Sequence, residues 1–254
     1  MKGSNVFTVM VVGDNPHELM EKYNSNIEVE PYVKYKYKDA DKIKNNSIKL
    51  FESIIEDPRK FDLNDYAVDM LKEKLSKMKN LSTFEYYKSL VEGYFIDDNG
   101  NALSTENPNG KWQTYKLGNN FSLPLKLLNG GETRESINSE IDWDSMHMNN
   151  TSVYESVWEM VVEGREPKNE HEQTLYDNMS VHTNYFKRFN NVDEYVIHNC
   201  AYWNYAYLDK NGWVDMDDAK NMFQWISTYF DKFVSKLQPT DKVTIFECTN
   251  GKVE

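Results

Sequence analysis

The chain has 254 residues, of which 39% are hydrophobic and 14% aromatic, so it can bury a sizeable core and is not intrinsically disordered. Its 41 acidic and 29 basic residues give a formal net charge of −12. A surface of that sign repels phosphate backbones, which disfavours a general nucleic-acid binder and suits a protein that meets a basic partner.

The N-terminal third predicts a strand, a short helix and then a helical block. The apolar run Val6–Val12 predicts the strand, and the Gly-Asp-Asn-Pro turn at 13–16 ends it. Pro16 opens a short helix at 17–23, and the Lys/Asp run at 34–44 is expected to be a solvated connection. Three amphipathic helices are expected at residues 47–56, at 64–78, and from the capping box at 82–85 to Val91.

The rest of the chain mixes short strands with helices. Residues 111–127 alternate like a strand pair broken at Gly118, Asn119 and Asn120, and hairpin turns are expected at 97–100 and 209–212. The clearest helix is 217–237, which has a full apolar stripe. Further helices are expected at 151–161 and 170–189, and further strands at 194–198, 201–208 and 242–248.

Strands at both ends of the chain flank a helical middle, which favours the α+β class. The preferred topology is a ferredoxin-like (βαββαβ) antiparallel sheet that carries a long, mainly helical insertion. The first strand and residues 242–248 would then be neighbours in one sheet. We expect a single globular domain, 1–254, with the helical segment 47–92 as a candidate subdomain.

No catalytic or metal motif of high specificity is present. Asp142, Asp144 and His147 bring two carboxylates and an imidazole into six residues, which could bind a divalent metal or act as an acid/base pair. Turn chemistry and surface charge explain the same residues, and nothing in the sequence nominates a further ligand. There is no glycine-rich phosphate loop and no nucleophile elbow, so no cofactor is expected.

The two cysteines, Cys200 and Cys248, lie on predicted core strands and are expected to be buried free thiols in a reducing compartment. His198 and Cys200 would share one face of their strand, where they could form a nucleophile pair if partly exposed. No segment approaches the roughly 20 apolar residues of a membrane span, and no signal-peptide cleavage pattern is present.

Aromatic residues gather on the predicted strands. On an open sheet face they could stack a base or a nucleotide, or they could pack under the helical insertion. The set comprises Trp112, Tyr115, Tyr202, Trp203, Tyr205, Tyr207 and Trp213.

Four segments together resemble a family of uncharacterised proteins from tailed bacteriophages. They are the Phe-Thr-Val strand at 7–9 followed by Pro31-Tyr32, the K-W-x-x-Y box at 107–121, the Ile-Asp-Trp element at 141–146, and the hairpin, helix and strand from Asn211 to Asn250. Asn119, Asn120 and Phe121 replace a Gly-Arg-Trp of the family, and a terminal Cys-His loses its His at Thr249. The family has no settled activity, so the resemblance implies a phage origin rather than a mechanism.

A small acidic phage protein without a catalytic signature is expected to inhibit a host defence protein, for example as an anti-CRISPR. Its acidic surface would engage a basic, nucleic-acid-binding groove in the cytoplasm of the host bacterium, without binding nucleic acid or membrane directly. The alternatives are a protein that sequesters a nucleotide signal on the aromatic face and an enzyme built on Asp142, Asp144 and His147. The expected contact residues are Trp112, Tyr115, Asn119, Asn120, Asp142, Asp144, Tyr205 and Trp213.

Overall fold

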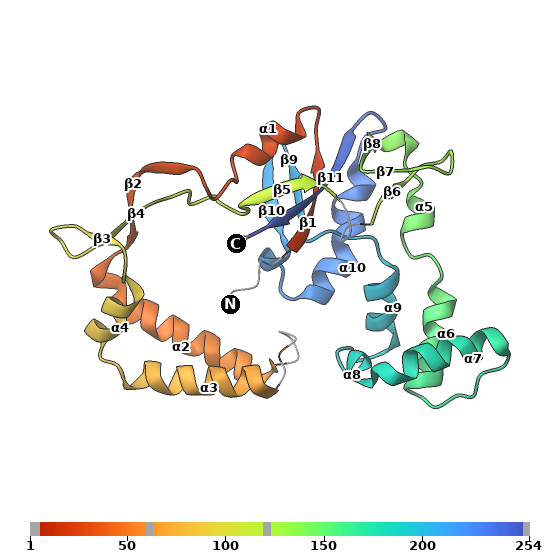
Figure 1. Ribbon diagram of the computed structural model, residues 1–254, viewed down its shortest axis with the longest axis horizontal. Coiled ribbons are helices and arrows are strands. Elements are labelled where there is room, and N and C mark those ends of the chain that lie inside the picture. Colours follow the sequence, from red (N-terminus) through yellow and green to blue (C-terminus); the bar gives the residue numbers. More distant parts are fainter. Residues whose placement is uncertain (1–5, 59–62, 64, 119–122, 251–254) are drawn as a thin grey trace. The chain divides into compact units, whose positions relative to one another are not determined.

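The computed structural model describes residues 6–58, 63, 65–118 and 123–250. The chain divides into two compact units, and Figure 1 shows the elements of each. Unit 1 comprises Met1–Ser25 and Asn109–Glu254, and unit 2 comprises Asn26–Pro108. The segment 47–92, the candidate subdomain, therefore falls inside unit 2 together with the strands on either side of it.

Unit 1 is built on a mixed sheet with the strand order β10-β9-β1-β11-β5, and β8 also pairs with β11. Strands β1 and β11 are antiparallel neighbours, from the pair Val6 and Thr249 to the pair Val12 and Val243, which confirms the expected pairing of the two ends of the chain. The strands are β1 (Val6–Val12), β5 (Thr114–Leu117), β8 (Glu135–Ile137), β9 (Ala206–Asp209), β10 (Gly212–Asp215) and β11 (Lys242–Thr249).

The α+β class is confirmed, but a ferredoxin-like topology is not. The sheet was expected to be antiparallel, whereas β1 and β9 run parallel, with Val9 opposite Ala206. In the split βαβ arrangement of ferredoxin-like folds another strand separates the two parallel strands, but here β1 and β9 are hydrogen-bonded neighbours. The physical reason is the long connection after β1, which allows the chain to cross over and enter the sheet again in the same direction.

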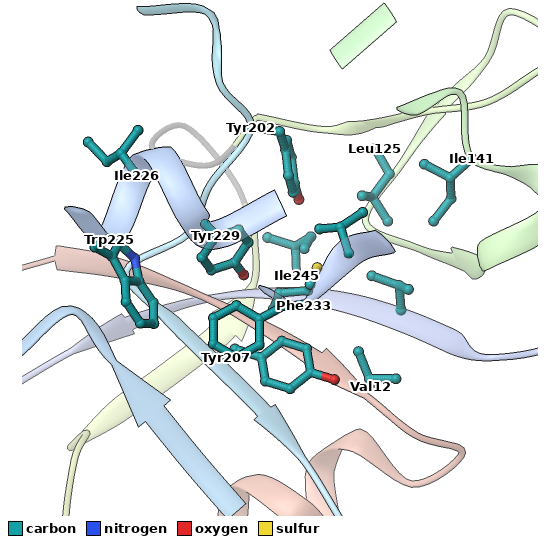
Figure 2. Close-up of a cluster of buried hydrophobic side chains, with 13 residues drawn as sticks. Val12, Leu125, Ile141, Tyr202, Tyr207, Trp225, Ile226, Tyr229, Phe233 and Ile245 are labelled. Carbon is teal, nitrogen blue, oxygen red and sulfur yellow. The ribbon is translucent and has the colours of Figure 1, made fainter. Parts of the chain in front are cut away.

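A helix packs on each face of the main sheet. Successive side chains of a strand point to opposite faces, so Met10 and Val12 face α10 (Met222–Lys232), while Val9 and Val11 face α1 (Pro16–Glu21). Figure 2 shows the core under α10, where the rings of Trp225, Tyr229 and Phe233 pack against the sheet. This two-sided burial explains why β1 is apolar at nearly every position.

The remaining elements of unit 1 are short and include a helical cluster with its own apolar core, formed by α6, α7, α8 and α9. They are β6 (Leu125–Lys126), β7 (Glu132–Thr133), η3 (Asn138–Glu140), α5 (Trp143–Met146), α6 (Thr151–Val161), α7 (Glu170–Met179), η4 (Ser180–His182), α8 (Thr183–Phe186), α9 (Val192–Cys200), η5 (Met216–Asp218) and η6 (Val234–Lys236).

Several elements expected in the second half of the chain differ in the structure. The strand expected at 194–198 is instead helix α9, because Asn191 caps it by accepting a hydrogen bond from the backbone N–H of Glu194 at 2.9 Å. Two expected long helices are interrupted. Residues 170–189 form α7, η4 and α8, and residues 217–237 form η5, α10 and η6, with Asn221 capping α10.

Unit 2 packs three helices with a three-stranded sheet of order β2-β4-β3. The expected capping box of α4 is confirmed by reciprocal hydrogen bonds between Ser82 and Glu85. Helix α2 begins at Ala40, within the run expected to be a solvated connection, and the expected first residue of α3, Asn64, lies outside the described residues. The elements are β2 (Glu28–Tyr35), η1 (Tyr37–Asp39), α2 (Ala40–Glu56), α3 (Asp65–Asn80), α4 (Thr83–Leu90), β3 (Phe95–Ile96) and β4 (Ala102–Glu106).

Candidate functional site

Trp112 lies just before β5 and Tyr115 lies on it, and both pack on the face of the sheet that α1 covers. Trp112 is only 3% exposed, and its indole N–H donates to the backbone oxygen of Met20 at 3.1 Å. The ring of Tyr115 lies 4.6 Å from that of Trp112, edge to face, and its hydroxyl is hydrogen-bonded to Nδ1 of His17 at 2.8 Å. These contacts fix both rings against α1.

Tyr205 and Trp213 lie on the same face and are tied to carboxylates. The hydroxyl of Tyr205 donates to Asp217 at 2.8 Å, and its pKa is raised by burial and by that hydrogen bond. The indole N–H of Trp213 donates to Oδ2 of Asp215 at 2.8 Å. Lys111 donates to the same oxygen at 2.9 Å, so the buried charge of Asp215 is matched.

The four predicted aromatic contact residues therefore belong to one cluster, but α1 covers much of it. A stacked base needs an exposed ring face, and Trp112 has none. The covering segment is α1 rather than the helical insertion that the sequence suggested. The cluster is explained as core packing, with Tyr115, Tyr205 and Trp213 half-buried at its margin.

Asp142 and His147 flank the two ends of α5, and Asp144 lies on it. Asp142 caps the helix by accepting from the N–H of Ser145 at 3.1 Å, and Asp144 is exposed. Nδ1 of His147 accepts from the backbone N–H of Tyr202 at 3.1 Å, and burial lowers the pKa of the imidazole. Within the described part of the chain, no group of three or more His, Cys, Asp or Glu side chains could hold a metal ion.

The other sequence-based candidates do not form a site. His198 and Cys200 lie two residues apart on helix α9, where positions i and i+2 do not face each other. Burial raises the pKa of the Cys200 thiol, which disfavours the reactive thiolate. Both cysteines are free and buried, as expected. Asn119 and Asn120 lie outside the described residues.

One cavity of unit 1 was not expected from the sequence. It has a volume of about 510 Å³ and lies where the parallel strands β1 and β9 end. Gly13, directly after β1, lies at its edge with a φ of +151°, and a Cβ there would meet Cδ1 of Leu19 at 3.0 Å. A glycine thus permits both the turn and the close approach of α1.

The cavity has an apolar interior. The rings of Tyr207 and Phe233 are stacked with centroids 4.4 Å apart, and each residue is 8% exposed. Figure 2 shows these two rings together, with the Tyr207 hydroxyl pointing toward Val12. Val12, Leu19 and Leu237 add aliphatic surface.

The mouth of the cavity is rich in carboxylates. Asp14, Glu18, Asp209 and Asp241 line it, together with two lysines, Lys210 and Lys236. In the described part of the chain, none of the four carboxylates forms an ion pair within 4.0 Å. The mouth therefore carries an excess of negative charge, four carboxylates against two lysines.

Two of these carboxylates are held in place by the chain itself. Asp209 accepts hydrogen bonds from the backbone N–H of Asn211 at 2.7 Å and from the hydroxyl of Tyr207 at 3.3 Å. Asp241 accepts from the backbone N–H of Gln238 at 2.7 Å. Burial and the nearby Asp209 raise the pKa of Tyr207, so its hydroxyl stays protonated and acts as a donor.

The sequence segments that form this cavity predict turns and do not by themselves predict a site. Residues 13–16 and 209–212 each follow a strand and carry an aspartate, but their proximity depends on the parallel pairing of β1 with β9. Carboxyl ends of parallel neighbours lie at the same edge of a sheet, which is where open α/β sheets commonly bind ligands. Recognising that pairing would have placed Asp14 beside Asp209.

No protein-family model matches the chain, and neither a curated protein nor a solved structure matches it. None of the helices in the described ranges has the length and apolar character needed to cross a membrane. Function must therefore be inferred from the geometry and charge of unit 1.

Proposed function

We propose that this protein is a non-enzymatic inhibitor, of the kind made by tailed bacteriophages, that binds a basic host protein and blocks its nucleic-acid-binding groove. The observation that carries the proposal is the mouth of the cavity in unit 1, where four carboxylates lack ion-pair partners among the described residues. A host defence protein that handles nucleic acid, in the cytoplasm of the infected bacterium, is the target class that fits this charge.

The physical basis is competition for one positive surface. A groove that binds nucleic acid is lined with lysine and arginine because it must neutralise phosphates. An acidic protein of net charge −12 is attracted to the same groove, and complementary charge accelerates the encounter. Once bound, it excludes the nucleic acid without any chemical step.

The two alternatives have less support from the site. An enzyme at Asp142 and His147 has less support, because Oδ1 of Asp142 caps α5, Nδ1 of His147 accepts a backbone hydrogen bond, and no third ligand or catalytic group joins them in the described part of the chain. A nucleotide held on the aromatic face would need an open ring surface, whereas Trp112 is buried under α1. Binding of a basic partner through charge requires neither a set of catalytic side chains nor an open aromatic surface.

The test is affinity capture with the tagged full chain from a lysate of a bacterial host, at low and at high salt, with mass spectrometry of the eluate. We expect one basic, nucleic-acid-binding protein in stoichiometric amount, released by salt and displaced by added DNA. A captured partner that resists both salt and DNA would refute the blocking of a nucleic-acid groove. Absence of any captured partner would refute binding to a host protein.

A further inference from the structure

We infer that the cavity at the ends of β1 and β9 receives the side chain of an arginine from the basic partner. The inference rests on the proposed function and gives it a specific point of attachment. It commits to a cationic, guanidinium-bearing occupant rather than to an anion such as phosphate, and each step below argues that choice from the residues around the cavity.

The size and the walls of the cavity suit a long side chain with a charged end. About 510 Å³ is within the range of pockets that bind small ligands, roughly 300–1,000 Å³. Val12, Leu19 and Leu237 offer aliphatic surface to the methylene stem, and long basic side chains bury such stems while keeping the charged group at a polar mouth. The stacked pair Tyr207 and Phe233 closes the interior.

The charge at the mouth selects a cation. An anion would meet four carboxylates there against two lysines, and neither Lys210 nor Lys236 is held in the cavity by an ion pair in the described chain. Both lysines are exposed, so their long side chains can turn into water. Asp209 and Asp241 are instead fixed by the hydrogen bonds they accept from the backbone.

Arginine fits these carboxylates better than lysine does. Its planar guanidinium presents several N–H donors and pairs with carboxylates in a bidentate way, whereas the lysine ammonium is a compact and strongly hydrated charge. Carboxylates from three separate segments surround the mouth, namely Asp14 and Glu18 after β1, Asp209 after β9, and Asp241 before β11. One guanidinium could therefore be contacted from more than one side.

The first experiment titrates the full chain with N-acetyl-arginine amide, N-acetyl-lysine amide and inorganic phosphate. Binding is measured by the changes in the backbone amide NMR chemical shifts. Arginine should bind, with its largest shifts at Gly13, Leu19 and Lys210, lysine should bind more weakly, and phosphate should cause no shifts there. Phosphate binding at these residues, or arginine shifts located elsewhere, would overturn the inference.

The second experiment uses matched variants. Asp14→Asn with Glu18→Gln removes two exposed carboxylates from the mouth, and Glu28→Gln with Glu30→Gln removes two exposed carboxylates from unit 2. The first pair should weaken arginine binding at least about tenfold, as expected for loss of charge-assisted hydrogen bonds, while the second should leave it unchanged. An equal effect of both pairs would show that only net charge matters and would refute the inference.

The two proposals can fail separately. If the Asp14→Asn, Glu18→Gln variant captures the host partner as well as the wild-type chain does, the cavity is not the attachment point, although the inhibitor proposal survives. If arginine binds in the cavity but no partner is captured from the host, the inhibitor proposal fails while the assignment of the cavity holds.

Discussion

Tyr229 and Tyr202 both carry buried hydroxyls, and we expect their replacement by phenylalanine to change the free energy of unfolding in opposite directions. Tyr229, on α10, is fully buried, and its hydroxyl has no hydrogen-bond partner of good geometry within the described chain, although the Asn204 side chain lies close by. Tyr202 is 3% exposed, and its hydroxyl accepts from Nδ2 of Asn204 at 3.1 Å. Replacing each by phenylalanine removes one oxygen and leaves the ring in place.

The expected changes in the free energy of unfolding differ in sign. A buried polar group without a partner costs about 1–3 kcal/mol, so Tyr229→Phe should stabilise unit 1 by about 1 kcal/mol. Tyr202→Phe loses a hydrogen bond and also leaves the buried Asn204 amide without this acceptor, so it should destabilise by about 1–2 kcal/mol. The two variants should therefore differ by about 2–3 kcal/mol.

Urea unfolding followed by tryptophan fluorescence measures this difference directly. All six tryptophans lie in unit 1, so the signal reports the unfolding of that unit alone. The slope with urea should be the same in both variants, since the surface exposed on unfolding is unchanged. Equal destabilisation by both substitutions would mean that the Tyr229 hydroxyl does find a partner, and the reasoning from its isolation would be refuted.

Three further predictions concern single side chains of unit 1. Arg165→Met should raise the pKa of Glu172 from about 2 toward its ordinary value, because the carboxylate loses its hydrogen bonds from Arg165; a carboxyl NMR titration that finds no change would contradict this. Burial lowers the pKa of His147, so the unfolded state binds this proton more tightly, and the free energy of unfolding should fall as the pH drops below about 6.5. His147→Leu should reduce that slope in urea unfolding at several pH values. Asn221→Ala should cost about 1 kcal/mol in the same assay, because Asn221 caps α10 through the N–H of Gln224 at 2.8 Å, whereas Asn221→Asp should cost little.

The elements with simple periodicity could be predicted from the sequence. The apolar run Val6–Val12 identified β1, the alternating residues 242–248 identified β11, and the stripe along 217–237 identified the helix that packs on one face of the sheet. Turn and capping motifs were also predicted correctly, since the turn at 209–212 joins β9 to β10 and the capping box starts α4. These signals are local, and tertiary contacts reinforce them.

Helix α9 shows where local signals fail. Tyr195, Val196 and Ile197 are β-branched or aromatic residues that are typical of strands. The structure instead buries Tyr195, Val196 and Cys200 at helical spacing against α6, and the cap from Asn191 starts the helix. Tertiary packing thus outweighs the intrinsic preference of the segment.

The candidate site depends on information that a single sequence hardly carries. Tyr115 and Trp213 lie on strands as predicted, whereas Trp112 and Tyr205 lie just before β5 and β9, and the cover of all four by α1 was not anticipated. The cavity requires β1 to pair with β9 across the whole helical insertion, and no local pattern specifies such a long-range parallel contact. Its carboxylates were therefore interpreted as turn residues.

The most direct test of the proposed function is the affinity for the captured host partner across a salt series, with and without DNA. Blocking of a basic groove predicts that the affinity falls steeply as salt rises and that DNA competes for the same site. An affinity that is independent of salt, or a ternary complex in which DNA and this protein bind the partner together, would contradict it.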